Sequence, residues 1–124
     1  MDSIEYKTFS KWVESAIEKG IPNEVISICF NLYDDIDDNW SIEMVGCTSY
    51  DSDDFDWACD EYTDFGTRNN PYSWNQKSDW EDIQQQVSYI IQKYLKEGMY
   101  KEQFINLRGV AVGFVDGDLI VLNY

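Results

Sequence analysis

The sequence predicts a single α+β domain, in which a mostly antiparallel sheet packs against an N-terminal helix and a second long helix and includes a C-terminal β-hairpin. Three observations support this prediction. Residues 25–33 alternate between large apolar and smaller side chains, as a half-buried strand does. Residues 83–95 instead repeat apolar side chains at helical spacing. The length of 124 residues suits one domain over residues 1–124, with a core large enough to fold without disulfides or metal.

The first helix is expected over residues 3–19. Its apolar side chains recur at helical spacing, and lysine and glutamate occupy the opposite face. Asp2 or Ser3 is a candidate N-cap, and Gly20 is a typical stop signal.

The second helix is expected to begin at Ser78. Ser78 and Glu81 have the spacing of a capping box. The apolar stripe of residues 83–95 follows, and Gly98 should end the helix. A short helical turn is expected over residues 100–107.

Two strands, residues 25–33 and 40–47, flank an acidic turn at residues 34–39 and should form a β-hairpin. Residues 57–62 are a candidate third strand. Residues 66–76 are rich in Asn and Ser, and we expect a long loop there.

The C-terminal region has the pattern of a second hairpin. Residues 110–114 and 119–122 have strand character, and Asp116-Gly117 between them is a favoured two-residue turn.

Negative charge is concentrated in the middle of the chain. The formal net charge is −15, and the stretch from Gly20 to Thr67 contains no Lys or Arg. Its acidic residues are Glu24, Asp34, Asp35, Asp37, Asp38, Glu43, Asp51, Asp53, Asp54, Asp56, Asp60, Glu61 and Asp64. The clusters at residues 34–38, 51–56 and 60–64 would converge at one edge of the sheet if their loops share an end. Such a surface attracts a cationic protein and disfavours nucleic acid or an anionic membrane.

Catalytic and metal-binding patterns are weak. The chain has no histidine, so the usual general base at neutral pH is missing, as are its pairs with Ser or Cys. Three cysteines without paired spacing disfavour zinc and are expected to be reduced and mostly buried. Asp35, Asp37 and Asn39 begin like a calcium loop, but the glycine and closing acidic positions hold other residues. We expect no catalytic residue, no metal and no cofactor.

The aromatic residues fall into two groups. Those on or beside an apolar stripe are expected mostly in the core: Trp12, Trp40, Trp80, Tyr89 and Tyr94. Those in or beside polar loops are candidates for exposed contacts: Tyr50, Phe55, Tyr62, Phe65, Tyr72 and Trp74.

Three segments carry a resemblance to known proteins. They are Phe30-Asn31-Leu32-Tyr33-Asp34, then Trp40-Ser41-Ile42-Glu43-Met44-Val45-Gly46, and, after an acidic gap, Trp57-Ala58-Cys59-Asp60-Glu61. Over residues 25–65 the chain resembles small acidic immunity proteins of bacteria. These are encoded beside polymorphic and contact-dependent toxins, and they neutralise the toxin domain in the producing cell. Immunity proteins span many folds, so the resemblance implies a role more than a fold.

The resemblance implies binding to a cognate toxin domain of a basic, nuclease type, which would be blocked by physical occlusion. The acidic clusters would hold the toxin's Lys and Arg side chains, and Trp57, Tyr62 and Phe65 would supply anchors. The candidate toxin-binding residues are Asp34, Asp35, Asp37, Asp38, Asp51, Asp53, Asp54, Asp56, Trp57, Asp60, Glu61, Tyr62 and Phe65.

Two other functions fit the sequence. The same acidic surface would suit a nucleic-acid mimic that inhibits another DNA- or RNA-binding protein. Tyr72 and Trp74 could instead stack on a sugar in a carbohydrate or small-ligand module, which would bind without salt dependence. The first residues do not read as a signal peptide and no apolar run is long enough to span a membrane, so a cytoplasmic location is expected.

Overall fold

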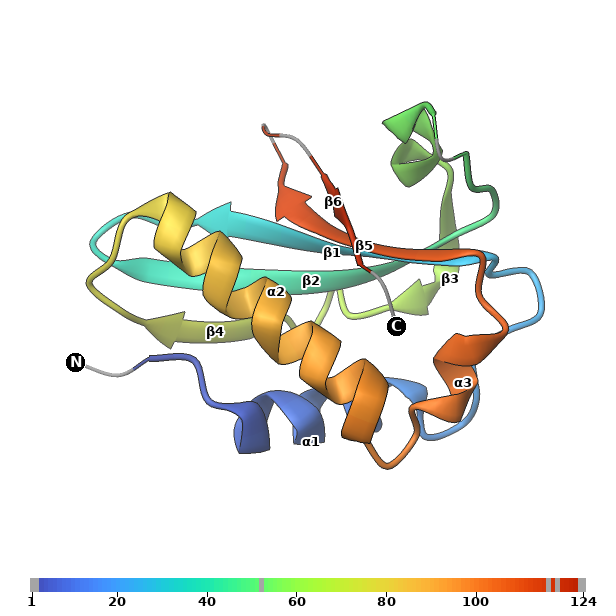
Figure 1. Ribbon diagram of the computed structural model, residues 1–124, viewed down its shortest axis with the longest axis horizontal. Coiled ribbons are helices and arrows are strands. Elements are labelled where there is room, and N and C mark those ends of the chain that lie inside the picture. The colour runs from blue at the N-terminus through green and yellow to red at the C-terminus, as the bar shows by residue number, and fades with distance from the viewer. Residues whose placement is uncertain (1–2, 52, 116, 118, 123–124) are drawn as a thin grey trace.

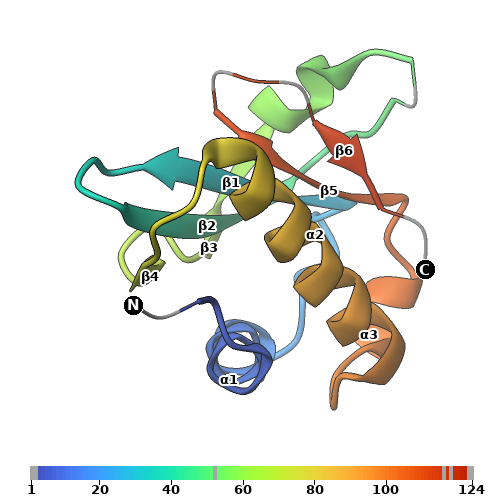
Figure 2. The same ribbon diagram turned by 60° about the vertical axis from the view of Figure 1, so that its left-hand side comes forward.

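The computed structural model describes residues 3–51, 53–115, 117 and 119–122, without the side chains of Phe55 and Cys59. Over these residues a six-stranded mixed sheet, mostly antiparallel, has helices against one face (Figures 1 and 2). The elements in chain order are α1 (Tyr6–Ile17), β1 (Ser27–Asp34), β2 (Asn39–Cys47), the 3₁₀ helix η1 (Phe55–Cys59), β3 (Glu61–Gly66), β4 (Tyr72–Asn75), α2 (Trp80–Glu97), α3 (Glu102–Ile105), β5 (Gly109–Phe114) and β6 (Ile120–Val121). The α+β prediction is confirmed.

The sheet order is β3-β2-β1-β5-β6, and β4 pairs with β2 beside β3. β1 pairs antiparallel with β2 and parallel with β5, so it lies in the middle of the sheet. The parallel pair is possible because α2 and α3 lie between the two hairpins in the chain and return it to the starting end of β1 (Figure 1).

The two faces of the sheet are covered differently. On β1, Ile28, Phe30 and Leu32 point toward the helices and belong to the main core. Cys29, on the opposite face, belongs to a smaller apolar cluster that Trp57 covers. The large core thus lies between the sheet and α1 and α2.

Both hairpins and the ends of both long helices agree with the sequence predictions. β1 and β2 pair in register from Ser27↔Cys47 to Asp34↔Trp40, and β5 pairs antiparallel with β6. Gly20 and Gly98 follow α1 and α2, and each donates its N–H to a carbonyl of the last turn. The turn predicted at Asp116-Gly117 includes a residue outside the described ones.

The predicted start of the first helix, at residue 3, is wrong. α1 begins at Tyr6, and its N-cap Glu5 makes no side-chain cap bond. The reason is that Ile4 is buried and its N–H donates to Gln76 Oε1 at 3.2 Å, which keeps this segment extended. Ser3 is therefore not the cap, and Asp2 lies outside the described residues.

The capping box predicted at Ser78 is also wrong by one residue. Asp79 is the N-cap of α2, and its Oδ1 accepts the N–H of Asp82 at 2.9 Å. The Ser78 hydroxyl instead accepts a hydrogen bond from Gln76 Nε2. The Ser78 side chain, which the spacing assigns to the cap, is thus bound by the buried Gln76 amide two residues earlier.

Two assignments between residues 57 and 76 are corrected by the structure. Residues 57–59 belong to η1, whose start is capped by Asp54, and the strand begins later as β3. The expected loop at 66–76 contains β4, which pairs with the first half of β2. A strand of four residues with Ser and Asn at alternate positions has too little apolar pattern to be predicted.

None of the helices in the described part of the chain has the length and apolarity that a membrane crossing requires.

Two glycines with positive φ, Gly66 at the end of β3 and Gly20 after α1, are expected to differ in how far an added methyl group destabilises the protein. Gly66 has φ +141°, and a Cβ there would meet the Met44 carbonyl oxygen at 2.7 Å, whereas Gly20, with φ +95°, has open space around it. Both Gly→Ala substitutions impose backbone strain, but only Gly66→Ala adds a backbone clash. We expect Gly66→Ala to lower the free energy of unfolding in urea by about 1–3 kcal/mol more than Gly20→Ala. Equal losses would show that the close approach to β2 is relieved without cost.

Candidate protein-binding surface

The acidic clusters lie at two ends of the sheet, so the predicted convergence of all three at one edge is wrong. The turn of residues 34–38 precedes β2, and the loop of residues 48–60 follows it (Figure 1, left and upper right). β2 separates them by about 27 Å, because each residue of a strand rises about 3.3 Å. Residues 51–56 and 60–64 do share an end, since Glu61 of β3 pairs with Cys47.

The turn between β1 and β2 has an unusual backbone. Ile36, Asp37 and Asp38 all have positive φ, at 62°, 54° and 63°. This left-handed region is unfavourable for residues with a Cβ and most of all for a β-branched residue. Ile36 is nevertheless 71% exposed, so no burial of its side chain compensates for the strain. An apolar side chain is therefore held outward at the tip of an acidic turn.

Hydrogen bonds from the turn itself and from β4 hold this conformation. Asp34 Oδ1 accepts the N–H of Ile36 at 3.0 Å, and the N–H of Asn39 donates to the Ile36 carbonyl at 3.0 Å. The Asn75 side chain and the Gln76 N–H donate to the carbonyls of Asp37 and Asp38. The turn is thus fixed by the strand beside it.

An open groove of about 810 Å³ lies next to the turn, between the C-terminal ends of β1 and β5 and the start of α2. Both views place the end of β1 beside the first turn of α2 (Figures 1 and 2). The lining residues are Leu32, Tyr33, Asp34, Trp80, Gln84, Phe114, Val115 and Gly117. Trp80 is 56% exposed and Val115 is also exposed. We call this feature the β1–β5 groove.

The expected burial of the stripe aromatics holds for Trp12, Trp40 and Tyr94 but not for Trp80 and Tyr89, which are exposed. Trp80 lies on the apolar stripe of α2 but in its first turn, where its ring makes a T-shaped contact with Phe114 and stays 56% exposed. Tyr89 lies on the outer surface of the same helix.

The acidic loop at the other end of β2 uses several of its carboxylates internally. Asp51 and Asp54 each accept the N–H of the residue two positions later, and Asp60 Oδ2 accepts the Ser49 hydroxyl at 2.6 Å. Trp57 is 3% exposed and packs against Tyr50 on the sheet. Its ring therefore fixes the loop to the sheet instead of facing solvent.

The other aromatic anchors predicted near this loop are half-buried. Tyr62 and Phe65 pack against the main core from β3, and the Phe55 side chain lies outside the described residues. Tyr72 and Trp74, the candidates for sugar stacking, are also half-buried and pack against each other. Tyr72 also contacts Phe9 and Trp12 of α1. These rings therefore pack β3, β4 and α1 against the main core.

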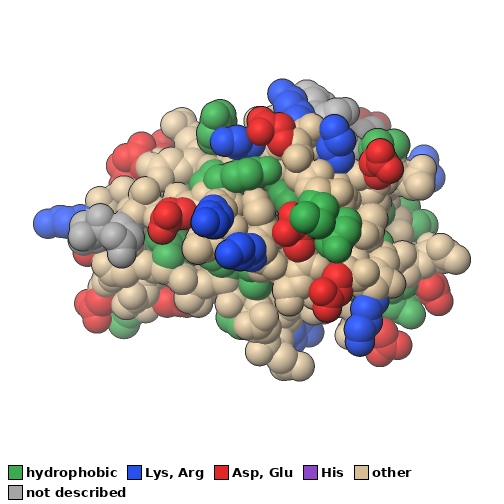
Figure 3. Space-filling model, turned by 90° about the horizontal axis from the view of Figure 1, so that it is seen from below, with side chains coloured by type: hydrophobic (Ala, Val, Ile, Leu, Met, Phe, Trp, Pro, Cys, Tyr) green, Lys and Arg blue, Asp and Glu red, His purple; other side chains and the backbone are tan. Residues whose placement is uncertain are grey.

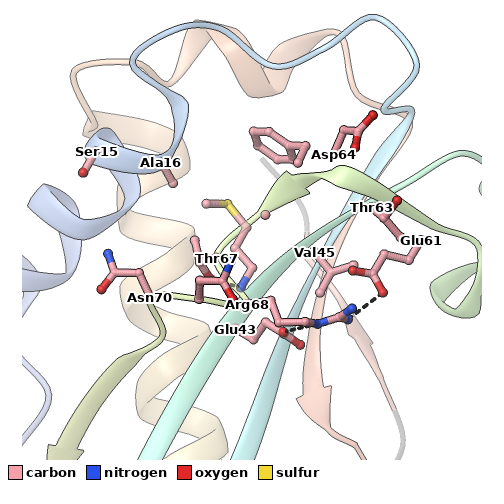
Figure 4. Close-up of a pocket in the computed structure, with 14 residues that line it drawn as sticks. Ser15, Ala16, Glu43, Val45, Glu61, Thr63, Asp64, Thr67, Arg68 and Asn70 are labelled. Carbon is pink, nitrogen blue, oxygen red and sulfur yellow. Dashed lines mark hydrogen bonds and ion pairs between the residues drawn. The ribbon is translucent and has the colours of Figure 1, made fainter.

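A charged network crosses the polar part of the sheet beside a second cavity of about 390 Å³ (Figure 4). Glu43 is 7% exposed and accepts hydrogen bonds from the Tyr33 hydroxyl at 3.0 Å and from Arg68 Nε at 3.1 Å. Arg68 also pairs with Glu61 at 2.6 Å. The guanidinium therefore neutralises a buried carboxylate, and Glu61, predicted as a binding residue, is engaged within the fold.

The helical side of the molecule has a different charge pattern. Lys and Arg side chains gather there among apolar and acidic groups (Figure 3). Lys7 and Lys11 belong to α1 and Lys93 and Lys96 to α2, and Lys93 Nζ lies 4.5 Å from the centre of the Tyr6 ring. The negative field is thus concentrated on the sheet and its loops.

Several features of the turn, the groove and the charged network escape sequence reasoning, although some leave a signal. Ile36 is an apolar residue among four aspartates, and Trp80 is flanked by acidic residues on both sides. The pairing of Glu43 with Arg68 has no comparable signal, because the two residues are 25 positions apart. Among the described residues no group of three His, Cys, Asp or Glu side chains could hold a metal ion.

Comparison of the chain with protein-family models, with curated proteins and with solved structures finds no match.

The strained turn predicts that Ile36→Asn stabilises the protein. Asn tolerates the left-handed conformation far better than Ile, and the exposed Ile36 side chain contributes little burial. We expect the free energy of unfolding in urea to rise by about 1 kcal/mol. Ile36→Val, which is also β-branched, should leave it unchanged. A loss of stability in Ile36→Asn would contradict the strain argument.

The network predicts an unusually weak acid at Tyr33. Burial, and then the bond to Glu43, raise the pKa of Tyr33 to about 12. The folded state holds this proton more tightly, so the stability that Tyr33 contributes is complete below pH 10 and is lost as the pH rises toward 12. We expect the absorbance change of tyrosinate, wild type minus Tyr33→Phe, to have its midpoint near 12. Glu43→Gln should move that midpoint downward, and a midpoint near the ordinary value of 10 in the wild type would contradict the network.

Proposed function

We propose that this protein binds a basic protein partner through the end of the sheet that carries the turn of residues 34–38 and inhibits it, in the manner of an immunity protein that neutralises a toxin domain. The observation that supports this most is the turn of residues 34–38, which holds Ile36 outward among four aspartates beside the β1–β5 groove. Strained backbone that survives with an exposed apolar side chain is typical of binding sites.

The charge of the surface supplies the attraction. With a net charge of −15 the protein steers a cationic partner toward itself over distances of about 10 Å at moderate salt. The turn lies next to the acidic first turn of α2, where Glu81 and Asp82 follow the cap Asp79. Carboxylates from two segments of the chain, the turn and the start of α2, thus lie at one end of the molecule.

Inhibition needs no chemistry in this proposal. A basic nuclease binds phosphate groups with Lys and Arg, and a carboxylate surface occupies the same side chains. The residues 25–65 that resemble acidic immunity proteins include the strained turn, which favours a toxin domain as the partner.

The experiment is a pull-down with tagged protein from the native host, washed with stepwise increases in salt. We expect a basic protein to be retained at low salt and released as salt rises. Two variants matched in charge locate the contact: Asp35/Asp37/Asp38→Asn alters the turn, and Asp53/Asp54/Asp56→Asn alters the opposite loop. Asn preserves the cap at residue 54 and tolerates the left-handed backbone at 37 and 38.

We expect the turn variant to weaken binding of the retained protein about tenfold at low salt, because three exposed ion pairs contribute roughly 0.5 kcal/mol each. The loop variant should weaken it less. The reverse order would move the contact to residues 51–56. Unchanged affinity and salt dependence in both variants would overturn the proposal.

A further inference from the structure

We infer that the β1–β5 groove receives an apolar side chain of the basic partner, so that the segment recognised is an apolar residue flanked by Lys or Arg. This inference rests on the proposed function and adds the chemistry of the segment that is bound. The segment that binds in the groove thus contains both an apolar side chain and positively charged groups.

The apolar part of the inference comes from the walls of the groove. Its apolar lining includes Leu32 from β1, Phe114 and Val115 from the end of β5 and the residue after it, and Trp80 from α2. Its volume of about 810 Å³ exceeds that of one side chain and lies within the range of ligand-binding pockets. Exposed aromatic and aliphatic groups around a recess are the usual receivers of an interface anchor.

The groove is formed before any partner arrives. The Trp80 ring meets Phe114 edge-on, with centroids 6.1 Å apart and planes at 90°. Phe114 in turn meets buried Trp40 at 5.9 Å. The cap bond of Asp79 fixes the helical turn that holds Trp80. A wall of packed rings on a capped helix loses little conformational entropy on binding.

The charge around the groove specifies the flanking groups. Asp34 belongs to its lining, and the turn that follows adds the carboxylates at residues 35, 37 and 38. Asp79, Glu81 and Asp82 surround Trp80 in the sequence and outnumber Lys77. An apolar ligand with negative flanks would be repelled here, whereas Lys or Arg on either side of the anchor would be attracted.

The test uses two synthetic peptides with blocked ends, Lys-Arg-Phe-Arg-Lys and Lys-Arg-Gly-Arg-Lys, titrated at low salt into isotopically labelled protein. We expect the phenylalanine peptide to shift the NMR signals of the Trp80 indole N–H and the Val115 amide. It should also bind at least about fivefold more tightly than the glycine peptide, because its ring is buried.

Two variants on α2 serve as a matched pair. Trp80→Ala should remove the difference between the peptides, whereas Tyr89→Ala, an exposed aromatic outside the groove, should retain it. Val115→Ser, at the residue after β5, gives a second variant with the same expected loss.

The outcomes distinguish binding of the phenylalanine ring in the groove from binding by charge alone. If both peptides bind equally and shift the signals of residues 34–38 but not those of Trp80 and Val115, the groove inference is overturned and the proposed function stands. If neither peptide binds at low salt, both are overturned.

Discussion

The buried side chain of Gln76 joins the parts of the structure on which the candidate surface depends. Its Oε1 accepts the N–H of Ile4 and the indole N–H of Trp74, and its Nε2 donates to Ser78 and Gln86. Its backbone carbonyl accepts the Trp40 indole N–H at 2.8 Å, and its N–H holds the Asp38 carbonyl. One residue at the end of β4 thus ties the N-terminal segment, β2, the acidic turn and α2 together. Because Gln76 is buried, leaving its polar atoms without partners would be costly.

The two acidic ends of the sheet serve different purposes in the fold. At residues 48–60, carboxylates cap η1 and close tight turns, and Trp57 anchors the loop, so the local structure itself explains those residues. At residues 34–38, Asp34 has such a role, but a fold that needed only a tight turn would be served better by Asn or Gly at positions 36–38. The exposed Ile36 in a left-handed conformation is therefore the feature that folding does not explain.

How much the sequence could predict depends on the range of the interactions. The first hairpin and the end of α2 follow from alternation and from Gly98, which are local signals. β4 and the parallel pairing of β1 with β5 depend on contacts between distant segments, and no local pattern encodes them. Trp80 was expected in the core because it shares the stripe of α2, yet its turn extends to the rim of the sheet. The separation of the acidic clusters was open to reasoning, since a strand places its preceding turn and its following loop at opposite ends.

The charge of the turn favours binding most when its strained backbone is also rigid. A flexible acidic loop would lose conformational entropy when a partner bound it, and this loss would offset much of the electrostatic attraction. Here Asn75 and Gln76 have already fixed the backbone, and the Trp80–Phe114–Trp40 row has fixed the groove beside it. The free energy needed to order the surface is spent during folding, where the large core between sheet and helices supplies it. A basic partner that neutralises the carboxylates would then stabilise the folded state further, because it binds only a surface that exists there.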